Sequence, residues 1–301
     1  MEDLIRMTTH FHKKPNLYSS HVQLKVSNLA HSIEYYTTII GFKILEQTET
    51  EAYLTADGQT SLVSLVEVKN AQPLKRGFAG LYHLALLLPS RKDLGNIVQH
   101  FVNLNVRLGA ADHDVSEALY LNDPDGNGIE IYIDRDESEW TWSEDEQVHM
   151  VTEQLNFQPI LAAADGKWDG LPAGTVMGHV HLSVASLEKS EEFYTNVLDY
   201  NVVTRYGAQA LFISTGKYHH HFGLNTWNSN NGHAPTDDMV GLKSFTVVLK
   251  DDAYAEAVKQ SLTSHGYVVE TFAEAPKFGG TQVFSTVDPN GLRIIFTVEG
   301  N

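Results

Sequence analysis

The stretch HVQLKVSNLAHSIEYYTTIIGF, residues 21–42, returns in the second half of the chain as HVHLSVASLEKSEEFYTNVLDY, residues 179–200. Each copy begins with the alternating pattern of a strand and continues, after a polar break, with the apolar spacing of a helix. Ser27 and Ser186 are the candidate residues for capping the two helices. The recurrence indicates a duplicated chain whose repeating unit begins with a strand and a helix.

Two further segments follow the same plan, GLYHLALLLPSRKDLGNIVQHFVNL from Gly80 and GLKSFTVVLKDDAYAEAVKQSLTSHG from Gly241. Short strands follow each helix, and a glycine turn joins the last two. We therefore predict an α+β fold of four βαβββ units, which start near His21, Leu81, His179 and Leu242. One unit leaves a sheet face uncovered, so the units are expected to pair around shared cavities.

The chain order suggests how these units form domains. We expect a tail over residues 1–17, an N-terminal open-barrel domain of units one and two over 18–134, a linker over 135–175, and a C-terminal open-barrel domain of units three and four over 176–301. The acidic run DRDESEWTWSEDEQ, residues 134–147, crosses the boundary into the linker and is typical of a solvated connector.

Composition restricts the classes of function. The net charge is −17, from 21 Lys+Arg against 38 Asp+Glu, which argues against nucleic acid or an anionic membrane as a partner. There is no cysteine, so thiolate catalysis and cysteine-ligated zinc are excluded. The first residues lack the apolar core of a signal peptide and no run reaches transmembrane length, so we expect a cytoplasmic protein. A homo-oligomer is compatible with this composition.

The repeat allows one position to be compared four times. Early in the first strand the units carry His21, His83, His179 and Ser244. Four residues after the glycine that precedes the last strand they carry Leu62, Glu130, His220 and Ile295. The N-terminal half thus offers two histidines and a glutamate, His21, His83 and Glu130, whereas the C-terminal half offers only His179 and His220.

A single strand histidine is more often a core or surface residue than a ligand, and a strand glutamate usually faces solvent. Their coincidence at repeat-equivalent positions favours a site instead. Two imidazoles and a carboxylate on one face of a metal form the 2-His-1-carboxylate triad of non-haem Fe(II) oxygenases. We therefore predict that His21, His83 and Glu130 bind Fe(II), or another divalent first-row metal, and that Glu130 points inward.

At these residues the chain resembles the vicinal oxygen chelate superfamily, and within it the two-domain extradiol dioxygenases, over about residues 18–298. The segment DHDVSEALYLNDPDGNGIE, residues 112–130, is similar to the family segment that ends in the glutamate ligand. The resemblance implies that Tyr120 contacts the substrate and that His113 lines the pocket. GKYHHHFGL, residues 216–224, resembles the strand with the family's acid–base histidine, which implies that role for His220.

The chain departs from that pattern in where its ligands lie. The best-known members keep the metal in the C-terminal half, but Ser244 and Ile295 stand here at the expected ligand positions. The equivalent of His220 in the N-terminal half is Leu62, so a base is missing there and His113 is the substitute candidate. The cluster His219, His220 and His221 is then either functional or a packing remnant.

The resemblance implies ring cleavage of a catechol-type aromatic diol by Fe(II) and O2. His113 would accept a proton from the diol, because imidazole titrates near neutral pH, and Tyr120 would donate a hydrogen bond to a substrate oxygen. Two alternatives remain. A glyoxalase-like lyase or isomerase needs a fourth protein ligand, usually a carboxylate at the position of Leu62, and a metal-free binding or resistance protein needs no triad.

Overall fold

The computed structural model describes residues 8–272 and 280–298. Four βαβββ units follow one another along the chain, as the sequence predicts. The first contains β1 (Tyr18–Val26), α1 (Leu29–Tyr35) with its continuation η3 (Tyr36–Ile40), β2 (Lys43–Gln47), β3 (Glu51–Thr55) and β4 (Ser61–Glu67). The second contains β5 (Gly80–Leu87), α2 (Arg91–Asn103), β6 (Gly109–Asp112), β7 (Ser116–Asn122) and β8 (Gly128–Asp134).

The second half of the chain repeats this order. The third unit contains β9 (Val176–Ser183), α4 (Leu187–Glu192) with η5 (Phe193–Val197), β10 (Asn201–Tyr206), β11 (Ala210–Ser214) and β12 (Phe222–Asn225). The fourth contains β13 (Gly241–Leu249), α5 (Asp252–Ser264), β14 (Glu270–Thr271), β15 (Thr281–Val287) and β16 (Arg293–Val298). Within residues 8–272 and 280–298, three short helices lie outside the units: η2 (Thr8–His12), η4 (Glu137–Glu139) and α3 (Phe157–Ala163).

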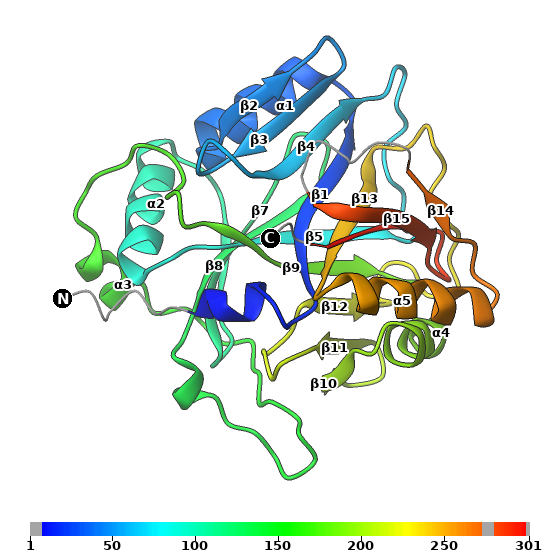
Figure 1. Ribbon diagram of the computed structural model, residues 1–301. Coiled ribbons are helices and arrows are strands. Elements are labelled where there is room, and N and C mark those ends of the chain that lie inside the picture. Colours follow the sequence, from blue (N-terminus) through cyan, green and yellow to red (C-terminus); the bar gives the residue numbers. More distant parts are fainter. Residues whose placement is uncertain (1–7, 273–279, 299–301) are drawn as a thin grey trace.

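The units pair across the two halves of the chain, and this differs from the sequence prediction. One eight-stranded sheet has the order β14-β15-β16-β13-β1-β4-β3-β2 and joins units one and four. The other has the order β10-β11-β12-β9-β5-β8-β7-β6 and joins units two and three (Figure 1). The expectation that units one and two share one cavity is therefore wrong, because β5 hydrogen-bonds with β9 and β1 with β13.

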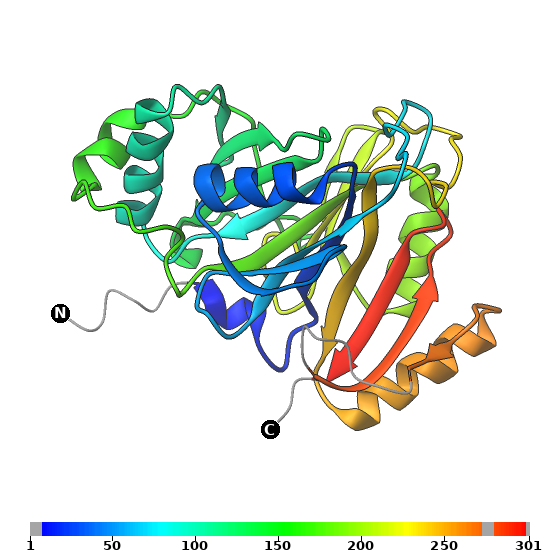
Figure 2. The same ribbon diagram turned by 90° about the horizontal axis from the view of Figure 1, so that it is seen from above.

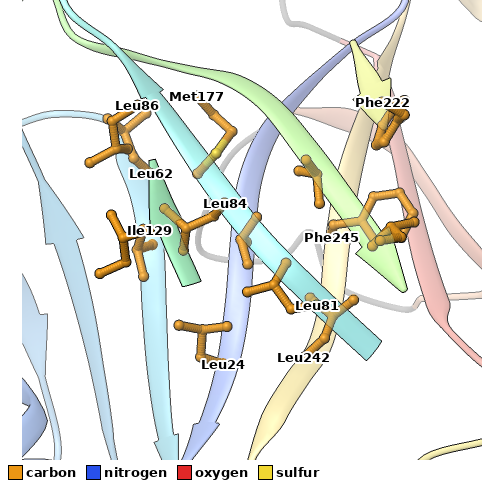
Figure 3. Close-up of a cluster of buried hydrophobic side chains, with 14 of the residues drawn as sticks. Leu24, Leu62, Leu81, Leu84, Leu86, Ile129, Met177, Phe222, Leu242 and Phe245 are labelled. Carbon is orange, nitrogen blue, oxygen red and sulfur yellow. The ribbon is translucent and has the colours of Figure 1, made fainter. Parts of the chain in front are cut away.

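The two sheets meet through one hydrophobic core. Leu24 of β1 and Phe245 of β13 lie across from Leu84 and Leu86 of β5 and Met177 of β9 (Figure 3). Strand alternation turns the intervening residues of each sheet away from this core. In β5, Ala85 and Leu87 belong to a separate cluster with Tyr132 on the opposite face. That opposite face is where polar side chains gather.

The helices flank the sheets (Figure 2), and their buried residues, such as Leu94 of α2 and Val258 of α5, belong to the same hydrophobic core. Asn28 caps α1 by accepting a hydrogen bond from the backbone of His31, one residue after the expected Ser27, whereas Ser186 caps α4 as predicted. The helix α3, within the predicted linker, packs closely on α2, because a Cβ on Gly95 would lie 2.4 Å from the carbonyl oxygen of Ile160. None of the helices among the described residues is long and apolar enough to cross a membrane.

Each Asp-Pro turn ties the two units of its own half together. The carboxylate of Asp123 accepts hydrogen bonds from the backbone of Asp125 and Asn127 and, at 3.1 Å, from the hydroxyl of Tyr36 in η3. Asp288 has the equivalent contact, at 3.5 Å, with Tyr194 in η5. The halves of the chain thus keep internal contacts although their strands enter different sheets.

Candidate metal centre

Three buried side chains converge on the face of the second sheet that points away from the core. They come from neighbouring strands, His83 from β5, Glu130 from β8 and His179 from β9. The Nε2 atom of His83 lies 2.9 Å, and that of His179 3.2 Å, from the same oxygen of Glu130. The two Nε2 atoms are 3.3 Å apart. Among the described residues this is the one group of three potential ligands that could hold a metal ion.

The charge state of this group suits a cation. Burial by itself would raise the pKa of Glu130, but the two neighbouring histidines outweigh it and hold that pKa well below its usual range. Burial lowers the pKa of His179, which the charge of Glu130 offsets in part. The lowered pKa keeps the carboxylate of Glu130 ionised, and this is the form of the side chain that binds a metal ion.

His83 and Glu130 lie together as the sequence analysis expected, and Glu130 is buried as predicted, with 3% of its surface exposed. His21 does not join them. It lies on β1 of the other sheet, opposite Thr246 of β13, and burial lowers its pKa to about 3. His179, which the sequence analysis assigned to an incomplete C-terminal set, occupies the third corner instead, because units two and three share a sheet.

The strand pairing also changes which residues are equivalent to Glu130. Glu130 pairs with Ala85 on β5, two residues after His83. The same position, two residues after the first-strand histidine, pairs with Ser64 in unit one and Gly223 in unit three. The sequence analysis counted four residues from each glycine turn and so took Leu62 and His220 as the equivalents of Glu130. Leu62 lies two residues before Ser64, and His220 lies three residues before Gly223. The fourth position around the triad is therefore Gly223, which has no side chain.

A cavity of about 730 Å³ opens beside the triad. Its apolar and aromatic wall includes Tyr82, Ile129, Met150, Phe212 and Trp227. The wall also contains His113, Tyr120 and His220, the three residues that the sequence analysis named as candidates for substrate contact or catalysis. Pairing β9 with β5 thus brings together in one cavity residues that lie in both halves of the chain.

Tyr120 and His113 form one hydrogen-bonded pair. The ring of His113 makes two contacts of 2.6 Å, from Nδ1 to the carbonyl oxygen of Val151 and from Nε2 to the hydroxyl of Tyr120. A carbonyl only accepts, so Nδ1 carries a proton, and in the neutral ring Nε2 is then an acceptor for the hydroxyl of Tyr120. Burial, and next the charge of Glu130, raise the pKa of Tyr120 well above its usual range, so the phenol stays protonated.

His220 lies on the other side of the triad, in the loop that precedes β12. Its ring centroid is 4.1 Å from that of His179. Burial, and then the neighbouring histidines, hold the pKa of His220 well below its usual range, so the ring is neutral. Its Nδ1 atom lies 2.8 Å from Nδ1 of His219, which is not among the residues that line the cavity and which in turn contacts Asp134.

Sequence reasoning missed part of this arrangement. His181, on the same strand face as His179, contacts the rings of His83 and Trp227 at the cavity. Its Nε2 atom accepts a hydrogen bond from the side chain of Asn225. The alternation HVH at residues 179–181 could have suggested both histidines, since residues two apart on a strand share a face.

Comparison with known proteins agrees with the fold. The family model described as the glyoxalase/bleomycin resistance protein/dioxygenase superfamily matches residues 19–131 and 176–296. The chain is 40% identical over 253 residues to the catechol-2,3-dioxygenase of Bacillus subtilis (strain 168), a match that covers 83% of this chain and 89% of the relative.

Solved structures resemble the chain over nearly its whole length. A Bacillus subtilis structure provisionally assigned as a dioxygenase superposes with a TM-score of 0.66 at 16% identity, covering 96% of this chain and 87% of the other. Glyoxalase I from Zea mays superposes with a TM-score of 0.54 at 17% identity, covering 94% and 92%. At such identities the likeness concerns the fold alone.

Proposed function

Because the chain belongs to the glyoxalase/bleomycin resistance protein/dioxygenase superfamily, we propose that it is an extradiol dioxygenase that cleaves the ring of a catechol-type aromatic diol with Fe(II) and O2. The observation that carries the proposal is the triad of His83, Glu130 and His179, with a glycine at the fourth position. The identity of 40% with a catechol-2,3-dioxygenase supports the same reaction class.

The triad fits a six-coordinate metal ion. Two ligand atoms at about 2.1 Å from one ion, and about 90° apart, lie roughly 3.0 Å from each other. The separations of 2.9, 3.2 and 3.3 Å are close to that value. As a purely hydrogen-bonded cluster the group is poor, because two Nε2 protons directed at one oxygen would also face each other. A shared cation removes this conflict.

Two histidines and one carboxylate leave coordination positions free for other molecules. When bound, a ferrous ion there would supply a Lewis acid for the two diol oxygens and a source of electrons for O2. The neutral His220 at the cavity wall would accept the proton that the diol loses, since its ring lies against that of His179. This moves the role of base from His113 to His220.

The Tyr120 hydroxyl has one proton and two neighbouring partners, Nε2 of His113 and the carboxylate of Glu130, so the three side chains act together. A substrate oxygen that approaches the Tyr120 hydroxyl would compete with His113 Nε2 for this proton, or share it. The phenol remains protonated at neutral pH, and it therefore supplies a hydrogen bond, not a charge, to the reacting oxygens. His113 is then a positioning residue, which orients the hydroxyl from its contact with Val151.

The glyoxalase-like alternative is less well supported by the site. Such an enzyme needs a fourth protein ligand, and Gly223 offers no side chain at the corresponding position. The space above Gly223 is also filled, because a Cβ there would lie 2.8 Å from the ring of His181. A metal-free binding protein would have no use for three ligand atoms within 3.3 Å of one another.

The proposal is tested by oxygen uptake. Protein purified without air and loaded with Fe(II) should consume one O2 for each catechol and release a yellow ring-opened semialdehyde. Protein loaded with Zn²⁺ is the control, since this ion has no redox chemistry and should give no uptake. Uptake that is absent with catechol and with alkyl- and aryl-substituted catechols, from protein with a full complement of iron, would refute it.

A further inference from the structure

A buried chain of hydrogen-bonding groups leads from the interior to the cavity. The Oδ1 atom of Asp134, the last residue of β8, lies 2.7 Å from Nε2 of His219. Nδ1 of His219 lies 2.8 Å from Nδ1 of His220, whose ring borders the cavity. Asp134 and His219 are 5% and 0% exposed, and neither touches the metal site through a ligand atom.

Each of the two hydrogen bonds in this chain contains one proton. Because the carboxylate accepts, it determines which nitrogen atoms carry these protons. Asp134 accepts from the hydroxyl of Tyr218 at 3.1 and 3.2 Å as well as from His219, so its oxygens act as acceptors. Nε2 of His219 must then carry a proton. In a neutral His219 the other nitrogen, Nδ1, is bare and accepts, so the proton of the second contact belongs to Nδ1 of His220.

We propose that Asp134 and His219 are positioning residues that hold His220 as its Nδ1–H tautomer, which leaves Nε2 unprotonated as the acceptor on the far side of the ring. The inference rests on the proposed function for its meaning, since it explains how His220 is ready to take a proton from a diol. Without the chain, neutral imidazole would be free to carry its proton on Nε2, where it could not act as a base.

The proton balance of the step is simple. The O–H bond of the diol breaks, a bond forms between that proton and Nε2 of His220, and the ring becomes an imidazolium. Its positive charge is stabilised through His219 by the carboxylate of Asp134, and the proton returns from Nε2 later in the cycle. In serine hydrolases a buried carboxylate likewise fixes the tautomer of the catalytic histidine, but it contacts that histidine directly, without a second histidine between them.

The tautomers can be read directly by long-range ¹H–¹⁵N correlation spectra of protein labelled with ¹⁵N-histidine. Zn²⁺ should replace iron in this experiment, because a diamagnetic ion keeps the signals narrow. His219→Gln and His220→Gln identify the two spin systems. We expect a protonated Nδ1 and a bare Nε2 for His220, and the reverse for His219. A His220 protonated on Nε2, or a His219 protonated on both nitrogens, would overturn the proposal.

Asp134→Asn supplies the second arm. The new amide can donate to Nε2 of His219, so both tautomers should invert, and kcat of the iron-loaded enzyme should fall about 10³-fold or more with KM changed only a few-fold. Asp288→Asn is the matched control, since it alters another buried aspartate, in the turn that joins β15 and β16 of the other sheet, and it should leave both tautomers unchanged.

The two arms separate this inference from the proposed function. The wild-type spectrum decides the tautomers even if Asp134→Asn does not fold. If His220 carries its proton on Nδ1 in a protein that cleaves no catechol, the hydrogen-bonded chain stands and the dioxygenase assignment falls. If ring cleavage is observed and Asp134→Asn retains its kcat with unchanged tautomers, the chain has no positioning role.

Discussion

His179 and His21 occupy equivalent strand positions, yet the structure gives them opposite surroundings. His179 lies 3.2 Å from the Glu130 carboxylate, whereas His21 is buried in the other sheet. We therefore expect His179→Ala and Glu130→Ala to lose the metal, and His21→Gln to keep about one ion per chain. Elemental analysis after anaerobic loading with Fe(II) measures this. Metal lost from His21→Gln but kept by His179→Ala would place the site in the first sheet.

His21 also predicts a dependence of stability on pH. Burial lowers its pKa to about 3, from an ordinary value near 6.5. Below about pH 6.5 His21 binds a proton in the unfolded chain but not in the folded chain. The contribution of His21 to the free energy of unfolding is therefore fully present above that pH and is lost as the pH falls towards 3. The loss is about 1.4 kcal/mol for each pH unit.

The same His21→Gln variant isolates this contribution, because glutamine does not titrate. Urea unfolding at pH 6, 5 and 4 should give a shallower decline for the variant, while all other titrating groups cancel in the difference between the two proteins. Identical slopes would mean that His21 is solvated or protonated in the folded protein.

Tyr120 should act on turnover and not on metal binding. Its hydroxyl contacts His113 at 2.6 Å and is not one of the three ligands. Tyr120→Phe is expected to retain the iron and to lose roughly ten- to a hundred-fold in kcat, the scale of one or two hydrogen bonds in a dry site. Tyr53→Phe, on β3 of the other sheet, is the control for removing a phenol hydroxyl. Oxygen uptake at the wild-type rate by Tyr120→Phe would exclude the residue from the reaction.

At the scale of elements, the strand β9 positions His179 because its neighbour in sequence is a glycine. A Cβ on Gly178 would lie 2.0 Å from the hydroxyl oxygen of Tyr132, a side chain that is fully buried and hydrogen-bonded to Tyr218. The Tyr218 hydroxyl in turn donates to Asp134, so a shift of the Tyr132 ring would disturb this chain of hydrogen bonds. The glycine is required here by close approach and not by an unusual backbone angle.

Gly178→Ala should therefore destabilise the protein by about 1–3 kcal/mol through overpacking, and weaken metal binding by shifting β9. Gly109→Ala is the matched control, a strand glycine in the same sheet whose Cβ would have its nearest neighbour at 3.6 Å. Denaturant unfolding and metal titration of both variants give the comparison. Equal free energies of unfolding for the two variants would show that the Tyr132 ring can move aside without destabilising the protein.

The elements show what the sequence could and could not reveal. The four units, the capping residue Ser186 and the inward side chain of Glu130 followed from local patterns, and all are confirmed. Counting four residues from the glycine turn gave the wrong equivalent of Glu130 in two units, because the turns differ in length. Gly126 precedes the paired residue Ile129 by three positions, whereas Gly58 precedes its counterpart Val63 by five.

At the scale of the whole molecule, the pairing of units was beyond a single sequence. The four units are alike, so each first strand could in principle pair with any other, and short-range patterns carry no information about that choice. Because of this error, the sequence analysis chose His21 as a ligand in place of His179. It also found no base near the predicted metal site. With units two and three in one sheet, His220 lies beside the triad, where the proposed function assigns it the role of base.

The cross-half sheets make a prediction for unfolding. Pairing of β1 with β13 and of β5 with β9 means that neither half contains a complete sheet, and one hydrophobic core joins both sheets. Partial unfolding of one half would expose that core and two strand edges, so we expect a single cooperative transition. Urea titrations followed by far-ultraviolet circular dichroism, by tryptophan fluorescence and by metal release should share one midpoint. Two separated transitions, one of which leaves the metal bound, would mean that the halves fold as independent units and that the strand pairing between them is weak.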